Sequence, residues 1–143
     1  MTPARLHGEF PYIHHSKKSL WELNKPLLYC VGHANSNDKI EVPKGFITDF
    51  ASIPRPVRFF FPTWQITGRP PVIHDWLYAS HQRSRKEADE IFYEAMIAAG
   101  YDVPRAWLQY RAVRAGGVNG YTNLSPKQFE ERTPHLFKQY FAG

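Results

Sequence analysis

Alternating apolar and polar positions, the pattern of half-buried β-strands, dominate the first part of the chain. Residues 20–31 alternate in this way and are interrupted by Pro26, which predicts one or two strands with a bend. The turn-forming residues 32–39 predict that residues 40–42 return as the second strand of a hairpin. Residues 1–19 are polar and predict an extended arm or an edge strand.

Residues 43–54 predict a further strand that carries an acidic residue within an apolar segment. On a strand, Phe46, Thr48 and Phe50 share one face and leave Asp49 on the other. An acidic residue in such a place has a role in a site, for example as a metal ligand, or its carboxylate accepts hydrogen bonds from backbone N–H groups of its own loop. Both interpretations of Asp49 stay open.

Helical spacing replaces the alternation in the second part of the chain. Residues 70–71 are prolines, which suit a first helical turn, and a helix is predicted over 72–80. Ser84 and Glu87 form a capping box that opens a second helix, which is predicted to end at Gly100. The apolar positions of this second helix recur at a period of 3.6 residues and are Ala88, Ile91, Phe92, Ala95, Met96 and Ala99.

A third helix is predicted between Pro104 and the glycine pair at 116–117, with three arginines that make it basic. Its predicted apolar positions are Trp107, Leu108 and residues 110–113. A last short helix is predicted to begin at residues 125–126, and an apolar tail follows it.

These elements predict an α+β fold in which a small N-terminal antiparallel β-sheet precedes three or four α-helices. A length of 143 residues and a hydrophobic content of 43% fit a single domain over 1–143. Within it we expect an extended arm over 1–19, a β-rich part over 20–54 and a helical part over 70–143.

The net charge of +5 has two interpretations, a surface that meets phosphate groups or a basic surface kept for solubility. Cys30 is the only cysteine, so an intrachain disulfide and a cysteine-based zinc site are excluded. The first residues lack the apolar segment of a signal peptide. No apolar run approaches the roughly 20 residues that span a bilayer.

Candidate chemistry is concentrated in the first two helices. His74 and Tyr78 are four residues apart and share a helix face, with Asp75 beside them. The short connection after Tyr78 makes the two helices antiparallel neighbours, so Asp89, one turn into the second helix, can approach His74 or Tyr78. A buried carboxylate that holds one imidazole nitrogen leaves the other nitrogen free to act as a base.

Two mechanisms and one structural alternative follow from these residues. In the first mechanism His74 deprotonates water, Asp89 orients the imidazole, and Asp75 binds a hard cation such as calcium. In the second, His74 and Asp75 are both ligands of a transition metal, and Asp49, Asp89 or another histidine completes the set. In the structural alternative, His74 and Asp89 only tie two helices together while Asp75 caps a helix or faces water.

The run from Val42 to Pro54, the sequence His74-Asp75-Trp76-Leu77-Tyr78 and residues 85–96 together resemble a phage and prophage family known as domain of unknown function 1353. The resemblance covers roughly residues 20–121. It implies a viral or prophage origin, with a location in the host cytoplasm or the virion, and it brings no established activity.

A second resemblance is local. His74-Asp75-x-x-Tyr78 followed by Ala88-Asp89-x-x-Phe92 is similar to the two-helix active site of secreted and viral-capsid phospholipases A2. The resemblance implies that His74 is the base, that Asp75 binds calcium, and that Tyr78 and Asp89 form the supporting network. The glycine-rich calcium loop of those enzymes has no counterpart of the usual form here.

The leading hypothesis from the sequence is therefore a phage-encoded hydrolase that acts on a phospholipid or another ester, with membrane lipid as a partner. The alternative is a non-enzymatic phage protein, either a virion component or a factor that contacts a phage or host protein. Nucleic-acid binding through Arg105, Arg111 and Arg114 is a third hypothesis, disfavoured because the chain has no recognised nucleic-acid-binding motif.

Overall fold

The computed structural model describes residues 12–15, 20–48, 68–117 and 121. Five strands precede three helices in the described part of the chain. The strands are β1 (Tyr12–His15), β2 (Leu20–Leu23), β3 (Leu27–Cys30), β4 (Lys39–Val42) and β5 (Ile47–Thr48). The helices are α3 (Arg69–Ser80), α4 (Arg85–Ala98) and α5 (Val103–Gly116).

The strands form two small antiparallel sheets. One has the order β1-β2-β5, and the other is the β3–β4 hairpin, in which Leu27 pairs with Val42 and Cys30 pairs with Lys39. The predicted break at Pro26 is confirmed, because it separates β2 from β3. The predicted hairpin is confirmed as well, and β1 is an edge strand of the first sheet.

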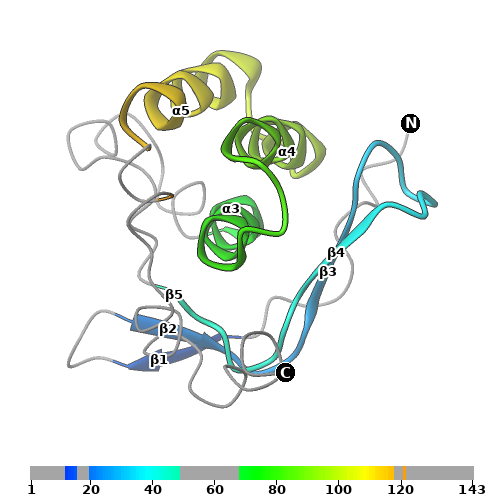
Figure 1. Ribbon diagram of the computed structural model, residues 1–143, viewed down its shortest axis with the longest axis vertical. Coiled ribbons are helices and arrows are strands. Elements are labelled where there is room, and N and C mark those ends of the chain that lie inside the picture. The colour runs from blue at the N-terminus through cyan, green and yellow to red at the C-terminus, as the bar shows by residue number, and fades with distance from the viewer. Residues whose placement is uncertain (1–11, 16–19, 49–67, 118–120, 122–143) are drawn as a thin grey trace.

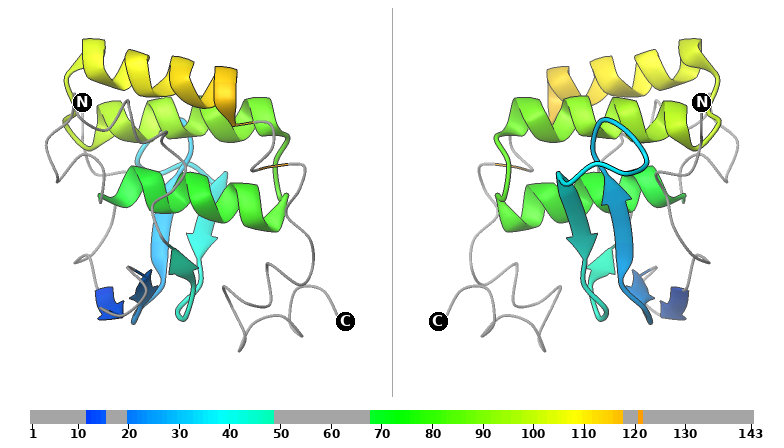
Figure 2. Two further views of the ribbon diagram at one scale, coloured as in Figure 1. Left: turned by 90° about the vertical axis from the view of Figure 1, so that its left-hand side faces the viewer. Right: turned by 90° about the vertical axis from the view of Figure 1, so that its right-hand side faces the viewer.

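The helices stack in a layered order above the strands (Figures 1 and 2). Helix α3 lies between the strands and α4, and α5 covers the far side of α4 (Figure 1). Strands followed by helices packed in layers confirm the α+β prediction.

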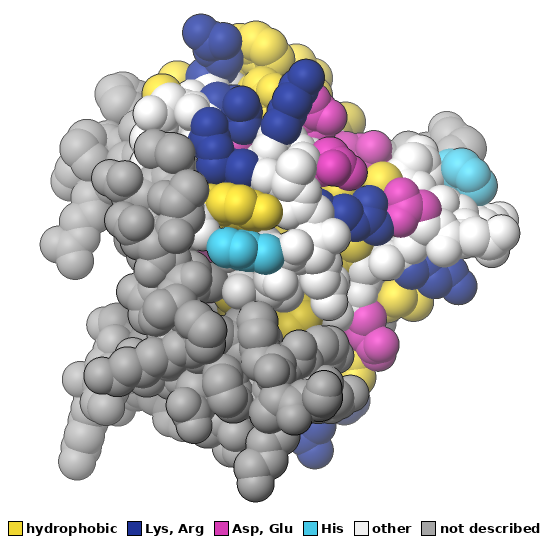
Figure 3. Space-filling view, viewed as in Figure 1, with side chains coloured by type: hydrophobic (Ala, Val, Ile, Leu, Met, Phe, Trp, Pro, Cys, Tyr) yellow, Lys and Arg dark blue, Asp and Glu magenta, His cyan; other side chains and the backbone are white. Residues whose placement is uncertain are grey.

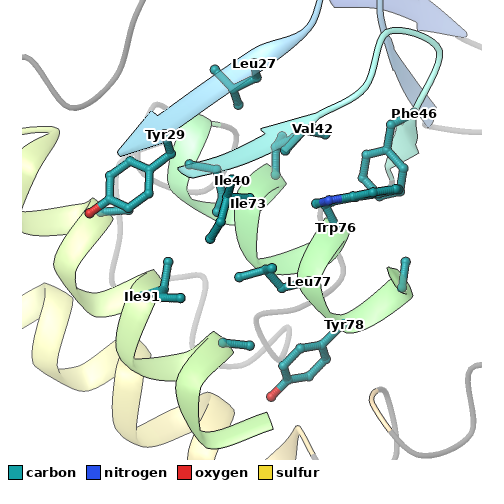
Figure 4. Close-up of a cluster of buried hydrophobic side chains, with 14 of the residues drawn as sticks. Leu27, Tyr29, Ile40, Val42, Phe46, Ile73, Trp76, Leu77, Tyr78 and Ile91 are labelled. Atoms are coloured by element: carbon teal, nitrogen blue, oxygen red, sulfur yellow. The ribbon is translucent and has the colours of Figure 1, made fainter. Parts of the chain in front are cut away.

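The main core lies between the β3–β4 hairpin and α3, where side chains from both elements point toward one another (Figure 4). Trp76 on α3 packs edge-on against Phe46, with ring centroids 5.3 Å apart. Helix α3 is buried on every side, since all residues from Pro70 to Ala79 are buried. A helix enclosed in this way has no polar stripe that faces solvent. The ionisable residues His74 and Asp75 are therefore unusual in this helix, because they are buried with the apolar side chains.

The helix termini follow the predicted signals, with one shift at the start of α3. Helix α3 begins at Arg69, before the predicted residue 72, because both prolines belong to its first turn. The Ser84 hydroxyl accepts a hydrogen bond from the Glu87 backbone N–H at 3.1 Å, which confirms the cap of α4. Gly100, which follows α4, has a φ of +90°, a conformation that favours glycine.

The predicted apolar face of α5 is wrong at two positions. Trp107 is 51% exposed and Leu108 is 43% exposed. The buried positions of α5 are Ala106, Gln109 and Val113, of which Val113 was predicted, and Ala106 and Val113 pack with buried α4 side chains. Residue hydrophobicity misled the prediction, because the side of α5 that meets α4 is set by the three-dimensional packing.

Some predictions fall outside the described residues, namely Asp49 and the rest of 49–54, and the last helix near 125–126. Among the helices that the structure describes, none combines the length and the apolar character needed to cross a membrane.

Candidate functional site: a buried histidine–aspartate network

The candidate site begins with two ionisable residues on the fully enclosed helix α3. His74 has no exposed surface, and Asp75 is 5% exposed. An ionisable group buried in this way needs a hydrogen-bond partner or an opposite charge. The partners therefore decide what each residue can do.

The structure brings His74 and Asp89 together, as the helix spacing predicts. Nε2 of His74 lies 2.6 Å from Oδ1 of Asp89, and neither side chain is exposed. The Ser84 cap starts α4 four residues after α3 ends, so the chain turns back and the first turns of α4 lie beside α3. This places Asp89, five residues after the cap, opposite His74.

Tyr78 joins the same carboxylate. Its hydroxyl donates to Oδ1 of Asp89 at 2.6 Å, so this oxygen accepts from both α3 side chains. The imidazole is also fixed by ring packing, with the Tyr78 ring centroid at 4.1 Å and the Phe92 centroid at 4.6 Å. The plane and position of the His74 ring are therefore held by its neighbours.

The other carboxylate oxygen receives positive charge from two arginines. Nη1 of Arg114, on α5, donates to Oδ2 of Asp89 at 2.9 Å, and Nη1 of Arg85 lies 3.6 Å from the same atom. Neither arginine was among the site residues predicted from the sequence. The i, i+4 spacing of Arg85 and Asp89 was a usable signal, whereas nothing in the sequence links Arg114 to Asp89 on α4.

These contacts determine the charge state of Asp89. Burial by itself would raise the pKa of Asp89, but the hydrogen bonds from His74 and Tyr78 and the interaction with Arg114 outweigh it and lower the pKa. Burial and the neighbouring Asp89 charge raise the pKa of Tyr78. Asp89 is thus ionised and Tyr78 is neutral at ordinary pH.

The ionised carboxylate also fixes the tautomer of His74. A carboxylate is an acceptor only, so Nε2 of His74 must carry the hydrogen that it shares with Asp89. In the neutral imidazole, Nδ1 then has the lone pair. This atom is buried and has no hydrogen-bond partner among the residues that the structure describes.

Asp75 has a different environment from its neighbour. Its Oδ2 accepts a hydrogen bond of 2.6 Å from the Thr48 hydroxyl at the end of β5. Asp49, the other predicted metal ligand, is outside the described residues. Within the described ranges, no three His, Cys, Asp or Glu side chains are grouped as a metal site.

These features define a class of α+β protein in which a carboxylate–imidazole network is enclosed by three helices. The chain belongs to the family described as "Protein of unknown function (DUF1353)", which matches residues 21–113. This match confirms the family that the sequence resembles.

A curated relative is the "Uncharacterized protein y4iH" of Sinorhizobium fredii (strain NBRC 101917 / NGR234). It is 42% identical over 72 residues, which cover 49% of this chain and 30% of the relative. The matched segment thus spans less than a third of that relative's length. No solved structure matches the chain.

Proposed function

We propose that the protein is a hydrolase in which His74 is the general base and Asp89 orients it. The observation that carries this proposal is the asymmetry of the imidazole. Nε2 is bound to an ionised carboxylate, while Nδ1 has a lone pair and no partner among the described residues. This is the arrangement by which a carboxylate prepares a histidine to accept a proton.

The proposed reaction is the hydrolysis of an ester. Nδ1 takes a proton from a water molecule as the water oxygen forms a bond to the ester carbonyl carbon. The carbon–oxygen bond to the leaving alcohol then breaks, and the alcohol oxygen receives the proton from His74. Tyr78 holds Asp89 in place through its 2.6 Å hydrogen bond, so its role is positioning.

The substrate class proposed is a phospholipid or a similar ester. It is supported by the sequence likeness of His74, Asp75, Tyr78 and Asp89 to the phospholipase A2 helices. A phage or prophage origin, with a location in the host cytoplasm or virion, is proposed on the family resemblance alone.

The direct test replaces His74 with asparagine, which cannot accept a proton from water. Wild-type protein is expected to hydrolyse members of a phospholipid and ester panel, and His74→Asn should lower the rate by roughly 10²–10⁴-fold. Circular dichroism at the assay temperature checks that the variant is folded. Tyr78→Phe is the matched control, because it removes one hydrogen bond to Asp89 and keeps the base, so a smaller loss is expected. A wild type inactive on the whole panel contradicts the proposal.

Cation binding at Asp75 is a separate proposal that rests on the same resemblance, and Asp49 is a further ligand only in the transition-metal alternative. Calorimetric titration with calcium is expected to give a binding signal for the wild type and a weaker one for Asp75→Asn. Zinc, titrated in parallel, represents the transition-metal alternative. The absence of a signal for either ion in the wild type would remove the proposal and leave the His74 mechanism untouched.

The second candidate is a non-enzymatic protein whose network is structural. It is favoured by the full burial of His74 and Asp89 and by the way Asp89 joins α3, α4 and α5. Under this candidate, His74→Asn lowers stability and the wild type hydrolyses nothing. The same pair of measurements therefore separates the two functions.

A further inference from the structure

The outer side of the α4–α5 pair carries apolar side chains that are exposed to solvent. The exposed fractions are 57% for Val103, 51% for Trp107 and 43% for Leu108 on α5. Ile97 on α4 is 38% exposed. We call Val103, Trp107 and Leu108 the outer α5 face, and a group of large apolar residues in such a place indicates an interaction surface.

Trp107 is held in a fixed position within this face. Its ring packs edge-on against Tyr93 of α4, with centroids 5.9 Å apart, and in a tilted arrangement against Tyr110 at 5.4 Å. Tyr93 and Tyr110 also pack against each other at 5.7 Å. The three rings form a rigid aromatic base, so Trp107 loses little conformational freedom when a partner covers it.

The charged side chains on helix α5 itself are all positive. Helix α5 contains three arginines and no acidic residue. Figure 3 shows Lys and Arg side chains beside exposed apolar side chains at the α5 end of the molecule. Arg114 is engaged with Asp89 and Arg105 with Asp102, whereas Arg111 is exposed and has no ion pair within the described ranges.

We propose that the outer α5 face binds the surface of an anionic phospholipid bilayer, with α5 lying in the plane of the interface. Interfacial helices combine an apolar side that enters the headgroup region with basic residues at its border. Trp and Tyr favour this boundary, and arginine can place its apolar stem on the lipid and its charge at the phosphates.

This inference deepens the proposed function, because it gives the hydrolase a surface that contacts lipid. It rests on the proposed function, in which a phospholipid is the substrate. Binding itself does not require His74. The test therefore measures binding alone, without any assay of hydrolysis, so its failure is distinguishable from failure of the proposed function.

The experiment is co-sedimentation of the full chain with vesicles of equal parts phosphatidylglycerol and phosphatidylcholine, and with vesicles of phosphatidylcholine alone. The wild type is expected to bind the anionic vesicles more tightly, and added salt should weaken the binding. Leu108→Gln and Arg111→Glu should each weaken it by roughly tenfold or more. Lys39→Glu is the matched control, because it makes the same charge change at an exposed position on β4 and should have a smaller effect.

Three outcomes would overturn the proposal. The first is that the wild type does not bind anionic vesicles, and the second is that Leu108→Gln binds them as tightly as the wild type. The third is that analytical ultracentrifugation shows a dimer that Leu108→Gln dissociates, because the face then binds a second copy of the chain. Circular dichroism of each variant ensures that lost binding reflects the surface and not unfolding.

Discussion

At the scale of single residues, Asp89 is the centre of the network. One of its oxygens accepts from His74 and Tyr78, and the other faces Arg114 and Arg85. Each contact partly offsets the loss of hydration of a carboxylate without exposed surface. The consequence is that one side chain fixes both the tautomer of His74 and the positions of its neighbours.

Replacement of Asp89 with asparagine is expected to destabilise the fold by about 3–5 kcal/mol at neutral pH, because His74 and Tyr78 lose their anionic acceptor and Arg114 loses its opposite charge. The folded-state pKa of Asp89 is lowered from its usual value. Its stabilising contribution is therefore complete above the unfolded pKa, about 3.9, and is lost as the pH falls through the lower folded pKa. Urea unfolding at neutral pH and at about pH 3 should show the difference between wild type and Asp89→Asn shrinking in acid. A difference that does not change with pH contradicts this account.

At the scale of secondary-structure elements, the start of α4 determines the site. The Ser84 hydroxyl accepts from the Glu87 backbone and also donates to the Glu87 carboxylate at 2.9 Å. This capping box sets the first residue of α4 and therefore the helix face on which Asp89 lies. A shift of one residue in this start would turn Asp89 away from His74.

Removal of the cap by Ser84→Ala is expected to lower stability by about 1 kcal/mol, because a backbone N–H of the first turn loses its partner. Ser80→Ala is the control, since among the described residues the Ser80 hydroxyl accepts only a 3.4 Å hydrogen bond from the exposed Gln82 backbone N–H. Thermal unfolding of the three proteins gives the comparison. Equal losses of thermal stability in Ser84→Ala and Ser80→Ala would show that the cap does not stabilise α4.

At the scale of the whole molecule, one carboxylate on α4 ties the helices to the β3–β4 hairpin. Oε1 of Glu94 accepts from the Tyr29 hydroxyl at 2.5 Å and from the Gly32 backbone N–H at 2.7 Å. The hairpin also packs on α3, which carries His74 (Figure 4). The strands thus support the helix that holds the proposed base.

Glu94→Ala is expected to lower stability by about 1–3 kcal/mol, because two donors on the hairpin lose their acceptor. Hydrogen exchange at residues 29–32 should accelerate as the hairpin separates from α4. Glu94→Gln keeps an oxygen at the same position and should have the smaller effect on both measurements. If Glu94→Ala exchanges as slowly as the wild type at these residues, the contact does not hold the hairpin.

Local signals in the sequence were sufficient to predict much of the fold and the central pair of the site. The hairpin followed from alternation and turn residues, and α4 followed from its capping box and 3.6-residue period. The pairing of His74 with Asp89 also followed, because a short connection between two helices leaves few ways to pack them. These features depend on residues that are close in the sequence.

Only the tertiary structure decided the features that depend on distant segments. It placed Arg114 against Asp89 and buried α3 on every side. It also left Trp107 and Leu108 exposed, although their hydrophobicity predicts burial. Periodicity shows which residues share a helix face, but the layer order decides which faces meet solvent, and that order results from contacts between segments far apart in the chain.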